Sequence, residues 1–196
     1  MNTQDKRTVD DAQLAGSILA RAAADLSMII DRELELGSVR LEHVTKRPAG
    51  PGQVHISFKL ALQREGAAWQ GCLLVPLPDA VALAGFMMMM NDEAVVRERA
   101  RTELDGPFKE ALLEVGKYVA GACDAVLRQT LPEGIAVRSD GCQGVRADVR
   151  PALEYREGDP LAVARVQARL HDFEPCELIL VLPSLVALAT PEAVSG

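Results

Sequence analysis

The chain has 196 residues, of which 48% are apolar and 25% charged, so it is long enough to bury a hydrophobic core without metals or disulfides. Its net charge of -7 and its scattered basic residues argue against nucleic acid as a partner. The sequence contains neither a signal-peptide pattern nor an apolar run long enough to cross a bilayer, so we expect a single cytoplasmic domain with no membrane partner.

The chain begins with a polar stretch that has no periodic apolar positions. We expect residues 1–10 to be a flexible tail, residues 11–190 to form the domain, and residues 191–196 to be a C-terminal tail. From Asp11 to about Leu34, apolar residues recur at helical spacing. This spacing predicts a long amphipathic helix.

Strands are predicted next, because apolar and polar residues alternate. Val39 to His43 and Val54 to Leu62 both alternate, and the Pro- and Gly-rich segment between them predicts a hairpin. Trp69 to Leu77 predicts another strand, and Pro78 then opens a helix that continues to about Met90. Asn91-Asp92 ends this helix, and the residues after it are expected to form a charged linker rich in Arg and Glu. We interpret the four methionines that end this helix as core filler and not as a cofactor site.

The second half of the chain has the same order of elements. A long helix is predicted from about Leu104 to Arg128, and the residues after it alternate again. The predicted strands are Ile135 to Arg138, Gly144 to Val149, Leu161 to Leu170 and Glu177 to Leu182.

A short match links the two halves. Leu77-Pro78 and Val81 to Ala84 are identical to Leu182-Pro183 and Val186 to Ala189, six identities at an offset of 105 positions. Helices and antiparallel strands in separate runs pack as layers. We therefore predict an α+β fold with an antiparallel sheet, long helices on one face, and two pseudo-symmetric half-repeats.

The helix from Leu104 to Arg128 has an apolar stripe and an opposite polar side. Glycine inside a helix costs about 1 kcal/mol relative to alanine, so Gly116 and Gly121 suggest that something approaches the helix closely. At about 100° per residue, an exposed row forms on the polar side. Its candidate binding residues are Glu110, Glu114, Lys117 and Gly121.

Spacing alone allows a simpler interpretation of this row. Glu114 and Lys117 lie three residues apart on a helix, which is the spacing of a surface ion pair worth a few tenths of a kcal/mol. Gly121 would then be incidental.

Glu114 to Gly121 resembles the active-site helix of the CheC/CheX chemotaxis phosphatases, which are related to flagellar switch proteins. The family helix carries Asp or Ser, then Glu, then Asn and a small residue. Glu110 stands at the Asp or Ser position, Glu114 at the Glu position, and Lys117 replaces the Asn. Gly71 to Met90 and Cys176 to Ala189 also look like this family's half-repeats, so the resemblance implies a CheC-like fold.

The resemblance also implies a mechanism. In that family the aspartyl phosphate and Mg²⁺ belong to the partner receiver domain, and the phosphatase inserts an amide that orients the attacking water, so no cofactor is expected in this chain. An amide both donates and accepts hydrogen bonds, whereas the Lys117 ammonium only donates. We therefore expect weak or absent catalysis from Glu114 and Lys117, with Glu114 still able to pair with a basic residue of the receiver.

No other amide takes the place of the missing one. Asn2 and Asn91 do not follow a glutamate at the family spacing, and the corresponding part of the first helix carries Ser17, Arg21 and Ala24.

Three functions remain open. The first is binding of the phosphorylated receiver domain of a chemotaxis or two-component response regulator, with absent or reduced phosphatase activity. The second is a structural scaffold that dimerises or joins a switch-like complex, and the third is an active aspartyl-phosphate phosphatase with a modified site. The cysteines and histidines lack metal-ligand spacing, and no motif of another enzyme class is present, so we expect no metal.

Overall fold

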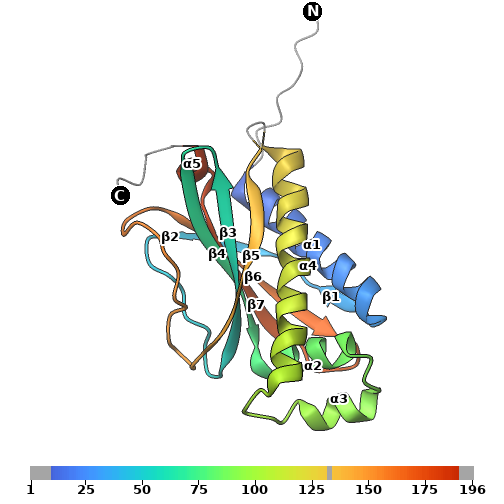
Figure 1. Cartoon of the computed structure of the whole chain (residues 1–196). Helices are drawn as coiled ribbons and strands as arrows, with labels where there is room; N and C mark the ends of the chain where they lie inside the picture. The colour runs from blue at the N-terminus through green and yellow to red at the C-terminus, as the bar shows by residue number, and fades with distance from the viewer. Residues whose placement is uncertain (1–9, 132–133, 190–196) are drawn as a thin grey trace, which may run out of the picture.

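The protein is built around one antiparallel sheet, seen in a computed structural model that describes residues 10–131 and 134–189 (Figure 1). The predicted tails, apart from Asp10, lie outside the described residues. The strands are β1 (Leu34–Leu36), β2 (Arg40–Val44), β3 (His55–Arg64), β4 (Ala67–Pro76), β5 (Ala136–Val145), β6 (Leu161–Leu170) and β7 (Cys176–Pro183). Their order across the seven-stranded sheet is β1-β6-β7-β4-β3-β5, and β2 also pairs with β6.

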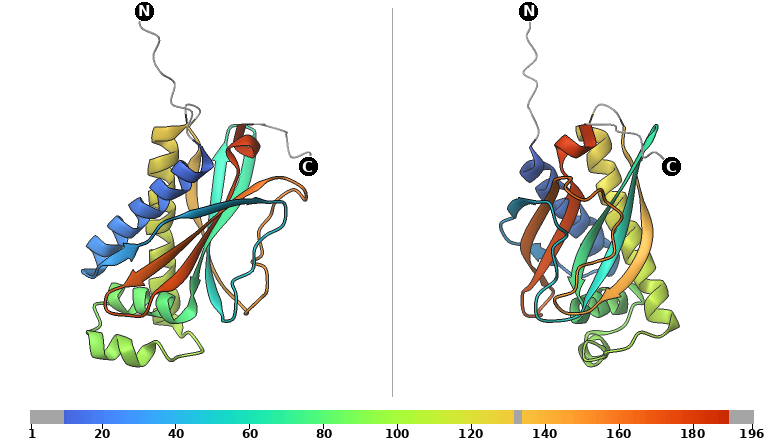
Figure 2. Two further views of the ribbon diagram at one scale, coloured as in Figure 1. Left: turned by 180° about the vertical axis from the view of Figure 1, so that it is seen from behind. Right: turned by 90° about the vertical axis from the view of Figure 1, so that its left-hand side faces the viewer.

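The long helices α1 and α4 cover one face of this sheet, as Figures 1 and 2 show. The helices of the domain are α1 (Asp11–Ile30), α2 (Leu77–Met87), α3 (Asp92–Glu98), α4 (Gly106–Thr130) and α5 (Leu185–Ala189). By length and composition α1 is apolar enough to cross a membrane, yet its apolar stripe is buried in the core of the domain. The predicted α+β fold with long helices on one face of an antiparallel sheet is confirmed.

The strand order is pseudo-symmetric. Strand β3 takes the place of β6 and β4 that of β7 when the sheet order is followed from the opposite edge. The edge strands β1 and β2 then correspond to the single edge strand β5. Each edge strand pairs with the other half of the chain: β1 and β2 pair with β6, whereas β5 pairs with β3. The two halves are therefore interlaced and do not lie side by side.

This interlacing overturns the predicted hairpin between β2 and β3. β2 pairs with β6, so that Arg40 lies opposite Arg165 and Val44 opposite Leu161. Alternation predicts a strand but carries no information about its partner. The segment 45–54 is also longer than the two to five residues of a typical hairpin loop.

The two Leu-Pro pairs do not occupy equivalent places either. Leu77-Pro78 begins α2, whereas Leu182-Pro183 ends β7. At the strand-to-helix corner of the first half, the Leu77 N–H donates to the carbonyl of Val54. In the second half, the Ser184 N–H donates to the carbonyl of Pro160. Leu77 thus corresponds to Ser184, and the offset found in the sequence is not the structural one.

Three further expectations need correction. Residues 92–98 form α3, where the sequence indicated only a charged linker. The two strands predicted at 135–138 and 144–149 are one strand, β5, because it follows β3 through an irregularity near Phe58. Met89 is 92% exposed, at φ 60° in the turn after α2, so it is not core filler. Met87, Met88 and Met90 do pack against the core.

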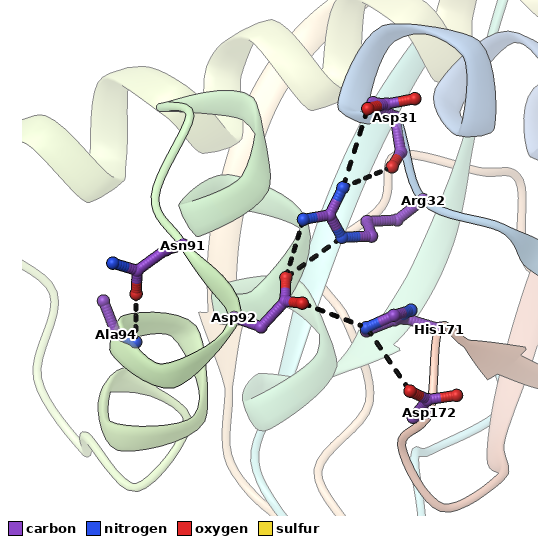
Figure 3. Close-up of polar contacts among 7 residues, drawn as sticks. All are labelled: Asp31, Arg32, Asn91, Asp92, Ala94, His171 and Asp172. Carbon is purple, nitrogen blue, oxygen red and sulfur yellow. Dashed lines mark hydrogen bonds and ion pairs between the residues drawn. The ribbon is translucent and has the colours of Figure 1, made fainter.

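Asp92 fastens α3 to two distant parts of the chain (Figure 3). Arg32, which follows α1, donates from Nε and Nη2 to Asp92 Oδ1 at 3.0 and 2.7 Å. His171, in the turn between β6 and β7, has its Nε2 atom 3.5 Å from Asp92 Oδ2. The hydrogen bonds from Arg32 hold the pKa of the Asp92 carboxyl below its usual range. The end of the domain that contains α3 and the turn between β6 and β7 is therefore held by ion pairs as well as by apolar packing.

The face of the sheet away from the helices is also partly buried. Leu153 and Tyr155, in the segment between β5 and β6, cover a second apolar cluster on that face, and His55 and Ser57 of β3 are buried there. Alternation in β3 predicted a polar outer face, so this cover was not expected. The sheet residues of the cluster are Cys72, Leu74, Leu161, Val163, Ile179 and Val181.

The two glycines inside α4 have different surroundings, which gives a first prediction. A Cβ at Gly116 would meet Ser139 Oγ at 3.2 Å and Phe58 Cδ1 at 3.3 Å, whereas one at Gly121 would meet nothing within 4 Å. We expect Gly121→Ala to raise the free energy of unfolding by about 0.5–1 kcal/mol, because alanine favours helix. Gly116→Ala should lower it by about 1 kcal/mol or more, because Phe58 is fully buried and has little room to move aside.

Urea denaturation of both variants measures these changes. If Gly116→Ala were as stabilising as Gly121→Ala, α4 would not be packed against the sheet as closely as described.

A second prediction concerns the dependence of folding stability on pH. Because the folded-state pKa of Asp92 lies below its ordinary 3.8, the folded protein binds fewer protons than the unfolded chain at low pH. The contribution of Asp92 is complete above the ordinary pKa and is lost as the pH falls through the lowered one. The stability difference between the wild type and Asp92→Asn should therefore shrink between about pH 6 and about pH 3.

Thermal melts at both pH values test this, with Glu93→Gln as the control for charge in the first turn of α3. A difference that stays constant with pH for Asp92→Asn would contradict the role given to its carboxylate.

Candidate functional site

α4 is held by its apolar side, which packs against α1 and the sheet. Asp105 caps its first turn, where the carboxylate accepts the N–H of Phe108 at 3.2 Å. The buried positions recur at helical spacing, so the opposite side of the helix faces solvent over its length. The buried residues are Phe108, Ala111, Leu112, Val115, Gly116, Val119, Ala120, Ala122, Cys123 and Leu127.

The structure brings the four predicted site residues together on that solvent side. Glu110, Glu114, Lys117 and Gly121 are all exposed and follow one another at three- and four-residue steps along α4. We call them the α4 row. Gly121 has open space above its Cα atom, so a partner backbone has room to approach it.

Glu114 and Lys117 are paired with each other. Lys117 Nζ donates to Glu114 Oε1 at 2.5 Å, and the side chains of Lys117 and Glu114 are 63% and 51% exposed. This is the surface pair that spacing alone predicted, and water screens it so strongly that it contributes only about 0.3–0.5 kcal/mol. The pair is therefore easily opened by a partner that offers a better anion to Lys117.

Asp124 and Arg128 continue the polar side of α4 but have a structural role. Asp124 accepts the backbone N–H of Val137 at 2.8 Å and Nε of Arg128 at 2.6 Å, which ties the start of β5 to the helix. Burial alone would raise the pKa of the Asp124 carboxyl, but the two hydrogen bonds outweigh it and hold the pKa below its usual range. These residues are therefore already committed within the domain.

Leu113 belongs to the same surface and was missed by the sequence analysis. It is 41% exposed and lies one helical turn from Glu110 and from Lys117. Its position outside the apolar stripe is a signal that helical periodicity could have given. An apolar side chain among charged ones is the usual composition of an interface centre with a polar rim.

Among the described residues, no group of three or more His, Cys, Asp or Glu side chains could hold a metal ion. Burial raises the pKa of both Cys72 and Cys123 to about 12, so these thiols are poor nucleophiles. The exposed side chains of the α4 row can bind charged and polar groups.

The corresponding residues of α1 also lie on a solvent side. Ser17, Arg21 and Ala24 are exposed, whereas the residues between them at helical spacing are buried. Placing these three residues on Glu110, Glu114 and Lys117 also places most buried residues of α1 on buried residues of α4. In this register α1 carries no carboxylate at the place of Glu114.

Comparison with known proteins identifies the fold. The sequence matches no protein-family model and no curated protein. The structure is similar to Thermotoga maritima FliY, with a TM-score of 0.66 and 18% identity over 96% of this chain and 93% of that one.

Two further structures share the fold. The chemotaxis protein CheX from Desulfovibrio desulfuricans has a TM-score of 0.57 and 12% identity over 86% of this chain and 97% of that one. The FliM middle domain from H. pylori has a TM-score of 0.61 and 9% identity over 96% of each chain. The chain thus has the CheC/CheX-like fold.

The weak pair on α4 gives a third prediction. We expect Lys117→Asn and Glu114→Gln each to change the free energy of unfolding by less than about 0.5 kcal/mol, and their double-mutant coupling to be equally small. Asp124→Ala is the contrast: it should cost about 1–3 kcal/mol, because it leaves the Val137 N–H without its acceptor. Chemical denaturation measures all four proteins. A coupling above about 1 kcal/mol would assign the Glu114–Lys117 pair to stability.

Proposed function

We propose that this chain binds the phosphorylated receiver domain of a chemotaxis or two-component response regulator through the α4 row, with absent or reduced phosphatase activity. The observation that carries the proposal is the exposure of Glu114 and Lys117 on one face of α4, within a fold shared with CheX. The cytoplasm, where such regulators act, is part of the same proposal.

The chemistry of Lys117 supports binding over hydrolysis. Hydrolysis of an acyl phosphate needs a group that accepts a proton from the attacking water in a hydrogen bond and holds that water in line. An ammonium has donors only, so Lys117 offers the water no acceptor. It can attract a phosphoryl oxygen as a point charge, but equal attraction in the ground state and in the transition state gives affinity without rate.

Docking would rearrange the pair on α4. A phosphoryl group on the receiver is a stronger anion than one exposed carboxylate, so Lys117 would leave Glu114 and turn to the phosphate. Glu114 would then pair with a basic group of the receiver, and Leu113 would provide an apolar contact beside them. Mg²⁺ and the aspartyl phosphate would both come from the receiver.

A fourth prediction tests this proposal with candidate receiver domains, each with and without beryllofluoride as the phosphoryl mimic. We expect binding at least about tenfold tighter with the mimic, and a loss of about tenfold for Glu114→Ala. Glu157→Ala, which removes an exposed carboxylate from the loop between β5 and β6, is the matched control and should bind as the wild type does. Calorimetry measures the affinities.

The rate of phosphate loss from the same receivers completes the test. The wild type should change this rate by less than about twofold, whereas Lys117→Asn should accelerate it by about tenfold or more. Acceleration by the wild type, abolished in Lys117→Ala, would instead support an active phosphatase with a modified site. Equal affinity for the receiver with and without beryllofluoride would contradict the proposal.

A scaffold function is the second candidate, favoured by a specific observation. The fold is shared with the FliM middle domain, which is also known in a FliG-FliM complex from H. pylori. Within the described chain, β2 and β5 each pair with a single strand, so a second copy could meet either edge outside the Val137 N–H of β5, which Asp124 already holds. A concentration-dependent homodimer together with receiver-independent behaviour would favour the scaffold.

A further inference from the structure

A groove with basic walls lies beside the sheet on the side away from α4. The end of β2 with the loop after it (residues 43–49) and the loop after β5 (residues 148–150) line this open groove, which has a volume of about 910 Å³. Figures 1 and 2 show these two loops running together, apart from the helical layer. We call it the loop groove.

The loops are fastened to each other, so the groove is a built feature of the fold. The Asp148 N–H donates to the carbonyl of Gly50 at 2.9 Å. Arg47 Nη1 donates to the carbonyl of Pro151 at 2.8 Å, and its guanidinium lies 5.5 Å from the ring centre of Tyr155. These contacts join the two walls through backbone as well as side chains.

Basic side chains in the loop groove lack the ion pairs that most basic side chains elsewhere on the described surface make. Lys46 and Arg150 are exposed and have no acidic partner among the described residues, and the Arg47 hydrogen bonds go to backbone carbonyls. Asp148 is the one acid in the lining, and His43 lies 2.8 Å from Asp11. Most other basic residues are neutralised in ion pairs: Arg21, Arg32, Arg40, Lys59, Arg99, Arg101, Lys117, Arg128, Arg165 and Arg169.

The groove also offers apolar surface and a strand edge. Val44, Pro48, Ala49 and Val149 line it, and Val149 is 42% exposed. β2, which ends in the groove, pairs only with β6 in the described chain, so its other side is open to hydrogen bonds from an added strand. Main-chain pairing at an open edge, with side chains held alternately, is how extended peptides are bound.

We infer that the loop groove binds an extended acidic segment of a partner protein. Charge complementarity selects the acidic side chains, because Lys46 and Arg150 have no acidic partner in the described part of the chain. The apolar lining and the β2 edge select a short peptide over nucleic acid, since a chain with a net charge of -7 would repel a long polyanion. This inference does not depend on the α4 row.

The test uses a fluorescein-labelled peptide of alternating Glu and Val, about ten residues long, with anisotropy as the readout. The double variant Lys46→Glu, Arg150→Glu should weaken binding by at least about tenfold. Arg97→Glu, at an exposed position of α3 without an ion pair, should change it by less than about twofold. Lys117→Ala should bind this peptide as the wild type does, so failure of the proposed function leaves the result unaffected.

Backbone amide shifts in an NMR titration locate the peptide, and they should concentrate at residues 43–49 and 148–150. Equal weakening by Arg97→Glu would reveal unspecific charge attraction and overturn the inference. So would competition by inorganic phosphate or a short oligothymidine at the affinity of the peptide, because either would assign the groove to simple anions or nucleic acid.

Discussion

The packing of α4 on the sheet is the contact on which the rest of the molecule depends. At Gly116 the helix comes so close to the sheet that a Cβ atom would lie only 3.2 Å from Ser139 Oγ and 3.3 Å from Phe58 Cδ1. This contact fixes the rotation of α4 about its axis, so the α4 row faces solvent even though its own ion pair is weak. The orientation of the surface is thus set by residues that never touch a partner.

The two faces of the domain handle charge differently. On the helical face and at the end of the domain that contains α3, most basic residues meet an acid, as Arg32 meets Asp92 and Arg128 meets Asp124. On the loop side, Lys46 and Arg150 meet no acid among the described residues. Because the sheet lies between these surfaces, a partner on α4 and a segment in the loop groove would not compete for space.

Local patterns predicted what depends on local geometry. The bounds of β6, the long helices and the exposure of the α4 row all follow from the period of apolar residues along one element. The Glu114–Lys117 pair was predicted because it is set by helix geometry alone. The roles of these residues stay predictions, since likeness of fold carries no chemistry with it.

Features that depend on contacts distant in sequence were not predicted. The partner of β2, the correspondence of Leu77 with Ser184 and the cover of the second sheet face all involve segments far apart in the chain. The charges of residues 92–98 indicate a linker, whereas the packing of Val95 of α3 against the core depends on residues distant in the sequence.

The interlaced strand pairing makes each half of the domain depend on the other half. A single half would expose the inner side of its sheet and leave its own edge strand without a neighbour, because that neighbour belongs to the other half. Two separate copies could satisfy each other only as an exchanged dimer with two-fold symmetry. Joining the two halves in one polypeptide makes that association independent of concentration, so each half can carry its own surface residues without having to match the other.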